Sequence, residues 1–94
     1  MTYLAQTDAE YAQEKSELEK AEILRKRIRA RVFLMTDGTV EQRKAKAEID
    51  PEVCSADDQY IFTIKAYETL KARRQRAELV IDVFRTLEAS RRKL

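Results

Sequence analysis

The side chains of this 94-residue sequence that could do chemistry are mostly cations, because the usual catalytic and metal-binding types are scarce. The sequence has no histidine, one cysteine and one glycine. Without histidine there is no Ser-His or Cys-His nucleophilic pair and none of the usual zinc or facial-triad iron sites. A single glycine excludes a phosphate-binding loop and a dinucleotide fingerprint. We therefore expect no enzyme activity, no cofactor, no metal and no small-molecule substrate.

The carboxylates and the cysteine are weak candidates for a catalytic or metal-binding site. Asp57 and Asp58 are adjacent in sequence, so on a helix their side chains diverge by about 100° and are poorly placed to share a site. The glutamates between positions 14 and 22 are best interpreted as a solvated helix face. Cys54 could be activated by a helix start, but a small packing residue is the better interpretation.

Basic residues are the remaining candidates for contact with nucleic acid or with another protein. One group, residues 25–31, lies early in the chain. The candidate contact residues lie in two later groups: Arg73, Arg74 and Arg76, then Arg91, Arg92 and Lys93. The last three have no obvious acidic neighbour, although cations at a helix C-terminus also occur simply as solubilising residues. Aromatic residues do not interleave with these runs, so any DNA contact would be weak and independent of base sequence.

Two long helices are expected to position these residues. Apolar residues recur at helical spacing from Leu4 to Met35, which predicts a first helix over about residues 8–36. Thr7 with Glu10 is a candidate capping box for its start. The helix should end at Asp37-Gly38, because glycine enters the left-handed cap conformation without penalty.

A short helix over about residues 40–48 should connect the long ones, with Thr39 and Gln42 as its capping box. Its inward-facing residues should be Val40, one of the alanines at 45 and 47, and Ile49. The third helix is predicted over about residues 51–91, because Asp50 can cap it and Pro51 suits the first helical position. Ile49 and Cys54 are spaced to form a hydrophobic staple.

The order of charges predicts that the two long helices run antiparallel. Residues 1–22 carry six acids and two bases, residues 23–36 carry five bases and no acid, residues 51–70 carry four acids and one base, and residues 71–94 carry eight bases and three acids. Antiparallel packing places each basic block beside an acidic block, whereas parallel packing places acid on acid. The predicted fold is therefore all-α, a long antiparallel coiled-coil-like helical hairpin in one domain. Its seam on the last helix should reach Phe84.

Such a hairpin leaves much apolar surface uncovered. The residues that fall beside the predicted seam are Ile23, Leu24, Leu34, Ile61, Phe62, Leu79, Val80, Val83 and Leu87. Burying these residues against a second copy would form a four-helix arrangement, so we expect a homodimer. No run of apolar residues is long enough to cross a membrane and no secretory signal opens the sequence, which favours a cytoplasmic protein without membrane contact.

Several short motifs resemble those of a set of small, uncharacterised helical phage and prophage proteins. The residues that carry the resemblance are Glu41 to Ala47, Asp50-Pro51-Glu52, Ala66-Tyr67, and the run from Ala77 to Arg92. Phe84 stands where these proteins usually have tryptophan. Their genes lie near phage recombination and replication genes, so the resemblance implies a non-enzymatic accessory role in DNA metabolism in the host bacterial cytoplasm. It transfers no catalytic residue.

Three functions are therefore open at this point. The first is an accessory protein of phage DNA recombination or replication, which binds a phage recombination protein and contacts DNA weakly if at all. The second is a phage inhibitor of a host defence nuclease, for which the acidic residues 1–22 could offer a local mimic of DNA. The third is a purely structural coiled-coil assembly factor.

Overall fold

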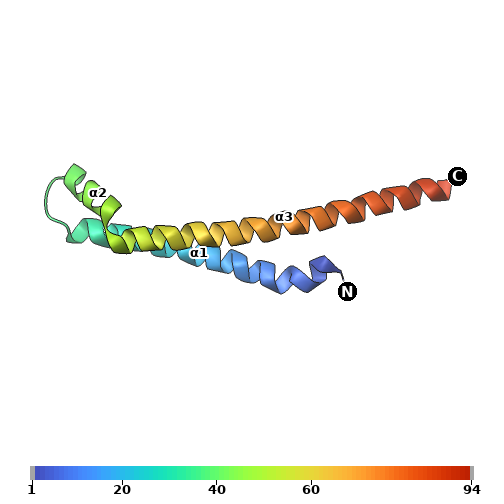
Figure 1. The fold of residues 1–94 in the computed structure, drawn as a ribbon, viewed down its shortest axis with the longest axis horizontal. Helices are drawn as coiled ribbons and strands as arrows, with labels where there is room; N and C mark the ends of the chain where they lie inside the picture. The colour runs from blue at the N-terminus through green and yellow to red at the C-terminus, as the bar shows by residue number, and fades with distance from the viewer. Residues whose placement is uncertain (1, 94) are drawn as a thin grey trace.

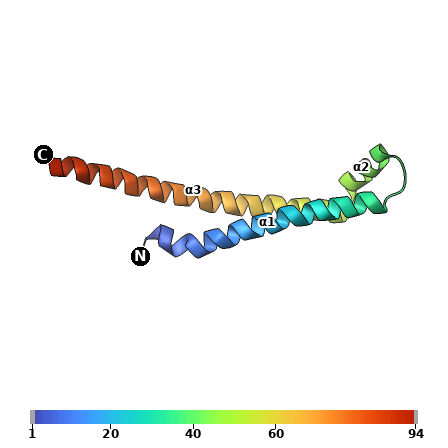
Figure 2. The same cartoon turned by 180° about the vertical axis from the view of Figure 1, so that it is seen from behind.

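The computed structural model describes residues 2–93, which form three α-helices and no strand (Figure 1). They are α1, Tyr3–Met35; α2, Val40–Ile49; and α3, Pro51–Lys93. Helix α1 packs along α3, and α2 sits at the bend between them, as both views show (Figure 2). The molecule is a rod of 76 × 23 × 14 Å. The predicted all-α hairpin is confirmed.

The two long helices run antiparallel, because residue numbers fall along α1 as they rise along α3. The contacts in order along α3 are Arg31 to Glu52, Arg29 to Asp57, Arg25 to Tyr60, Tyr11 to Tyr67, and Asp8 to Arg74. Four of these contacts involve an arginine, three of them with an acid and one with an aromatic ring. The charge blocks therefore meet as expected, and the Arg25 guanidinium lies 4.4 Å from the centre of the Tyr60 ring.

The hydrophobic core is small and follows the first half of α3. The buried apolar residues in the described chain are Ala47, Val53, Ala56 and Leu70. Three buried threonines, Thr7, Thr36 and Thr63, complete this interior. Each threonine hydroxyl donates to the carbonyl oxygen four residues earlier in its own helix, which satisfies the hydroxyl proton locally. Burial is thus concentrated on a few positions, and each of them carries a large share of the stability.

Helix α1 begins five residues before the predicted start. Thr2 is the N-cap, and its side-chain oxygen accepts a hydrogen bond of 3.2 Å from the backbone N–H of Ala5. The prediction that Thr7 caps the helix is wrong. Thr7 lies one turn inside α1, where its hydroxyl donates to the carbonyl of Tyr3 over 2.8 Å.

The prediction that Gly38 caps α1 is wrong, because the helix ends at Met35 and its C-cap is Thr36 in an extended conformation. Gly38 has a φ of +121° and lies three residues after the end of α1, in the bend.

The predicted caps at the starts of α2 and α3 are formed. Thr39 and Gln42 form the expected reciprocal capping box of α2. Asp50 caps α3 by accepting from the backbone N–H groups of Glu52 and Val53. These caps fix where α2 and α3 begin.

Helix α2 turns less apolar surface inward than the sequence predicts. Ala47 is buried, whereas Val40 and Ile49 are exposed. The hydrophobic staple is not formed, because Ile49 and Cys54 both face solvent; the Cys54 thiol instead lies 3.5 Å from the carbonyl oxygen of Glu48. Ala47 is the one buried residue of α2.

One arginine of α1 ties the three helices together. Arg29 pairs with Glu48 of α2 and, over 2.7 Å, with Asp57 of α3. All three side chains are partly or largely exposed to solvent, so each pair contributes only modestly to the free energy of unfolding. Their joint effect is to fix α2 against the hairpin at a place where few apolar contacts do so.

Helix α3 extends well past the N-terminal end of α1 (Figure 1). The hydrogen bonds and ion pairs between the two helices that lie farthest along α3 are those of Arg74, which meets the first turns of α1. We call residues 76–93 the C-terminal overhang. Phe84, expected in the seam, is exposed because α1 does not reach it. No helix among residues 2–93 is both long and apolar enough to cross a membrane.

Candidate partner and nucleic-acid interface

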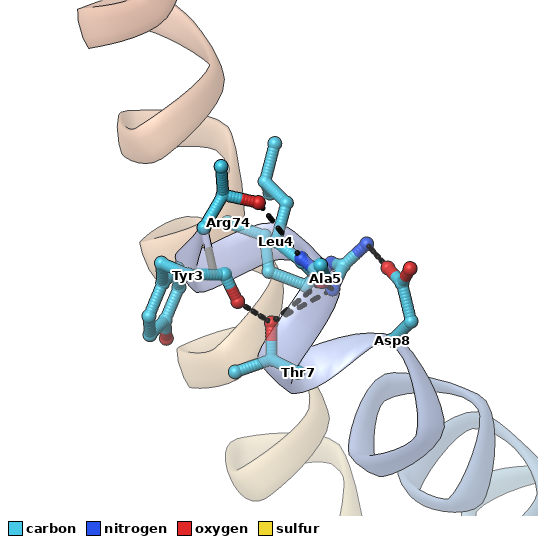
Figure 3. Close-up of polar contacts among 7 residues, drawn as sticks. Tyr3, Leu4, Ala5, Thr7, Asp8 and Arg74 are labelled. Carbon is cyan, nitrogen blue, oxygen red and sulfur yellow. Dashed lines mark hydrogen bonds and ion pairs between the residues drawn. The ribbon is translucent and has the colours of Figure 1, made fainter.

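Among the predicted contact residues, Arg74 is held inside the hairpin. Its guanidinium donates to the carbonyl of Leu4 over 3.1 Å, to the hydroxyl of Thr7 over 2.8 Å and to the carboxylate of Asp8 over 2.7 Å (Figure 3). Its side chain is only 15% exposed. The arginine therefore fastens the first two turns of α1 to α3, and we exclude it from the contact surface.

A stacked tyrosine pair lies directly beneath this arginine. The rings of Tyr11 and Tyr67 are 5.5 Å apart, their hydroxyls are 3.0 Å apart, and Arg74 lies 4.7 Å from the centre of the Tyr11 ring. The hydrogen bond with Tyr11, and after it desolvation by burial, raises the pKa of Tyr67 above its usual value of about 10. The pair is a structural contact of the seam.

Because the pKa of Tyr67 is raised in the folded chain, the wild type should lose free energy of unfolding at alkaline pH. Tyr67→Phe has no phenol at this position and should not show that loss. Between pH 10 and the higher folded-state pKa, the folded chain binds the Tyr67 proton more tightly than the unfolded chain does. The contribution is therefore complete below about pH 10 and is lost as the pH rises further. The melting temperatures of the wild type and of Tyr67→Phe should differ at about pH 8 and converge as the pH rises through the folded-state pKa of Tyr67. Tyr60→Phe is the control, and a gap that stays constant for Tyr67→Phe would contradict the prediction.

Arg73 and Arg76 of α3 are both exposed, and Arg73 also lines a groove with Glu10 and Glu14 of α1. They line one shallow surface groove of about 500 Å³ together with Lys65 and Glu68. Lys65 was not among the predicted contact residues. Its spacing from Arg76, eleven residues or three helical turns, is the signal that could have found it.

The candidate residues at the end of the chain are exposed as well. Arg91 and Arg92 point to solvent, and Arg91 approaches Glu88 at 3.5 Å. The side chain of Lys93 lies outside the described residues, although its backbone ends α3. The two exposed basic groups therefore lie at opposite ends of the overhang, with Arg73 and Arg76 around its start and Arg91 and Arg92 near its end.

Between these groups lies a surface that the sequence identified only as uncovered. Its five large apolar side chains are all at least half exposed: Leu79, Val80, Val83, Phe84 and Leu87. They recur in steps of three and four residues, so they share one side of the helix. We call them the overhang row. No other helix in the described chain covers this row, because the N-terminal end of α1 lies beside Arg74.

A second apolar surface lies at the opposite end of the rod. Helices α1 and α2 enclose an open groove of about 590 Å³ with Ala30, Phe33, Leu34 and Ala47 as its apolar lining. Lys26 and Lys44 lie at its edge with the Arg29–Glu48 pair. No feature beside this groove indicates an occupant.

No group of three or more cysteine and carboxylate side chains among residues 2–93 is placed to hold a metal ion. The exposed surface of the overhang is a row of apolar side chains with arginines at either end. Comparisons of the sequence with protein-family models and with curated proteins, and of the structure with solved structures, find no match.

Proposed function

We propose that this chain is a non-enzymatic accessory protein of phage DNA recombination or replication that works by binding another protein through the C-terminal overhang. The process comes from the resemblance of residues 41–92 to small phage proteins. The mode of action is supported by one observation above the others: the overhang row is a set of large apolar residues on a helix that its own hairpin leaves bare. An apolar row of this kind is typical of a helix that packs against another chain.

Capture from infected cells tests this function. The tagged chain and its Val83→Asp variant would be expressed in the bacterial host during infection, and the captured proteins identified by mass spectrometry. We expect a phage recombination or replication protein that binds the wild type and is lost with the variant. Capture of a host nuclease would instead support the inhibitor hypothesis. Self-association with no captured protein would support a structural assembly factor.

The inhibitor hypothesis has less support from the surface charge. Asp8 is engaged by Arg74 and Glu22 by Lys26, so part of the acidic segment 1–22 is neutralised within the chain. A mimic of DNA needs an acidic face that is free to meet the nuclease. The exposed basic groups near the overhang also oppose binding to a DNA channel, which is itself basic.

Any DNA contact should be weak and should depend on the tip of the overhang. In fluorescence anisotropy with a labelled duplex at low salt, we expect the double variant Arg91→Glu, Arg92→Glu to lose binding. The control is Lys15→Glu, Lys20→Glu, which changes the net charge equally but lies in the acidic half of α1. Binding should fall steeply between about 50 and 200 mM salt, because phosphate contacts release counterions. Equal losses in both variants, or no binding at low salt, would remove DNA from the proposed function.

A further inference from the structure

The overhang row is bracketed by cations on its own side of the helix. Arg76, Val80, Val83, Leu87 and Arg91 follow one another in steps of four, three, four and four residues. This spacing keeps all five on one face, since three and four residues are close to one helical turn. Both arginines are exposed. The row thus begins and ends in a positive charge.

Two of the three acids of the overhang lie on a different face. Glu78 and Asp82 lie roughly opposite the row, whereas Glu88, four residues after Phe84, lies at the edge of the row and lines a groove with Phe84. Glu88 approaches Arg91 at 3.5 Å, and Arg91 is 78% exposed, so this is a weak surface pair that leaves the Arg91 guanidinium open to a carboxylate of another chain. The row with its two ends therefore carries two cations and one acid, a net positive charge.

We infer that the overhang row binds an amphipathic helix of a partner protein whose apolar stripe is flanked by acidic residues. This inference rests on the proposed function, protein contact through the overhang, and adds the chemistry of the partner. Burial of the apolar side chains of the row favours binding of a partner helix whatever the charge of that helix. The arginines at the two ends, Arg76 and Arg91, then select an acidic partner, because opposite charges across an interface favour the correct partner and like charges oppose the wrong one.

The same charges argue against a second copy of this chain as the occupant of the row. Two rows packed antiparallel about Val83 would place Arg76 of each copy near Ser90 and Arg91 of the other. Two rows packed parallel would place each arginine beside its own equivalent. Parallel packing sets cation against cation at both ends, and antiparallel packing sets Arg76 against an Arg91 that Glu88 already pairs, so neither gives a net attraction between the charges. An acidic helix turns both ends of the row into attractive pairs.

Two designed peptides of about 18 residues test the inference, a length that covers the row at 1.5 Å per residue. Both carry leucines at steps of three and four residues; one has glutamates beside the leucines and the other has lysines. Binding of each labelled peptide to the full chain would be measured by fluorescence anisotropy at low and at high salt. We expect the glutamate peptide to bind at least about tenfold more tightly at low salt, with the preference shrinking as salt is added.

Variants of the full chain separate the two parts of the inference. Val83→Asp should abolish binding of the glutamate peptide, while Arg76→Glu with Arg91→Glu should reverse the preference in favour of the lysine peptide. Circular dichroism should show unchanged helix content, since all three side chains are exposed. Val40→Asp, at an exposed valine on α2, is the matched control and should leave binding unchanged.

Three results would overturn the inference. Equal affinity for both peptides would show that the arginines select nothing. Binding that survives Val83→Asp would place the peptide elsewhere, for example in the groove between α1 and α2. A concentration-dependent dimer in sedimentation that Val83→Asp dissolves, and that excludes the peptide, would assign the row to a second copy. A peptide preference without a captured recombination protein would leave this chemistry standing and reject the proposed process.

Discussion

Leu70→Ala should lower the free energy of unfolding by about 3 kcal/mol, the middle of the range for a buried leucine cut to alanine. Leu70 is 7% exposed and is the largest apolar side chain in the described core. The other buried apolar residues are two alanines and Val53, so Leu70 supplies a large share of the apolar volume that the described core buries. Small domains are stable by only about 5–15 kcal/mol, so the variant should unfold at a much lower urea concentration.

Leu79→Ala is the matched control for this measurement. It removes the same atoms from the same helix, but Leu79 is 63% exposed in the hairpin. Its unfolding free energy should stay within about 0.5 kcal/mol of the wild type at low protein concentration, as for other surface substitutions. Equal losses in the two variants would contradict the hairpin as the unit of stability, because Leu79 would then be buried by a second copy. The homodimer expected from the sequence is tested by the same pair of variants.

The hairpin could be predicted from the sequence because two independent patterns agree. The chain has one glycine, at position 38, and one proline, at position 51, so it can bend sharply only in the segment from 38 to 51. The alternation of acidic and basic blocks then fixes the direction of the second long helix. Arg29 beside Asp57 and Arg74 beside Asp8 are the contacts in which these blocks meet.

The start of α1 was harder to predict because capping motifs recur inside helices. Thr7 with Glu10 has the sequence of a capping box, but so does any threonine three residues before a glutamate. Thr2 caps the helix without such a partner. Thr7 can stay inside because its hydroxyl bonds to the Tyr3 carbonyl, a local bond that threonine makes at low cost within a helix.

The contact surface could be predicted only in part, and Arg74 shows why. Neighbouring helical positions diverge by about 100°, so residues 73, 74 and 76 cannot all face the same way. The cluster of bases predicted that Arg74 lies on the surface. Its place in the seam depends on oxygen atoms of Leu4 and Thr7, which lie nearly seventy residues away in sequence. The overhang row escaped prediction as a site for a related reason, since its exposure depends on where α1 begins.

Arg74→Met should loosen the N-terminal end of α1 while leaving the rest of the hairpin folded. Methionine keeps an unbranched stem but cannot donate to the Leu4 carbonyl or the Thr7 hydroxyl. Hydrogen bonds from a charged donor contribute about 1.5–3 kcal/mol each, and Asp8 is largely exposed and adds little. We expect a loss of about 2 kcal/mol, confined to the first turns because few apolar contacts hold them.

Hydrogen exchange followed by mass spectrometry distinguishes this local opening from global unfolding. Amides of residues 6–12 should exchange about tenfold to thirtyfold faster in Arg74→Met, while those around Val53 should keep their protection, since 2 kcal/mol corresponds to roughly that factor. Arg73→Met removes the same charge one position away, from an exposed side chain, and should leave both regions unchanged. If Arg73→Met opened α1 as much as Arg74→Met, net charge would be holding the helix in place. The hydrogen bonds drawn in Figure 3 would then not be what fastens α1 to α3.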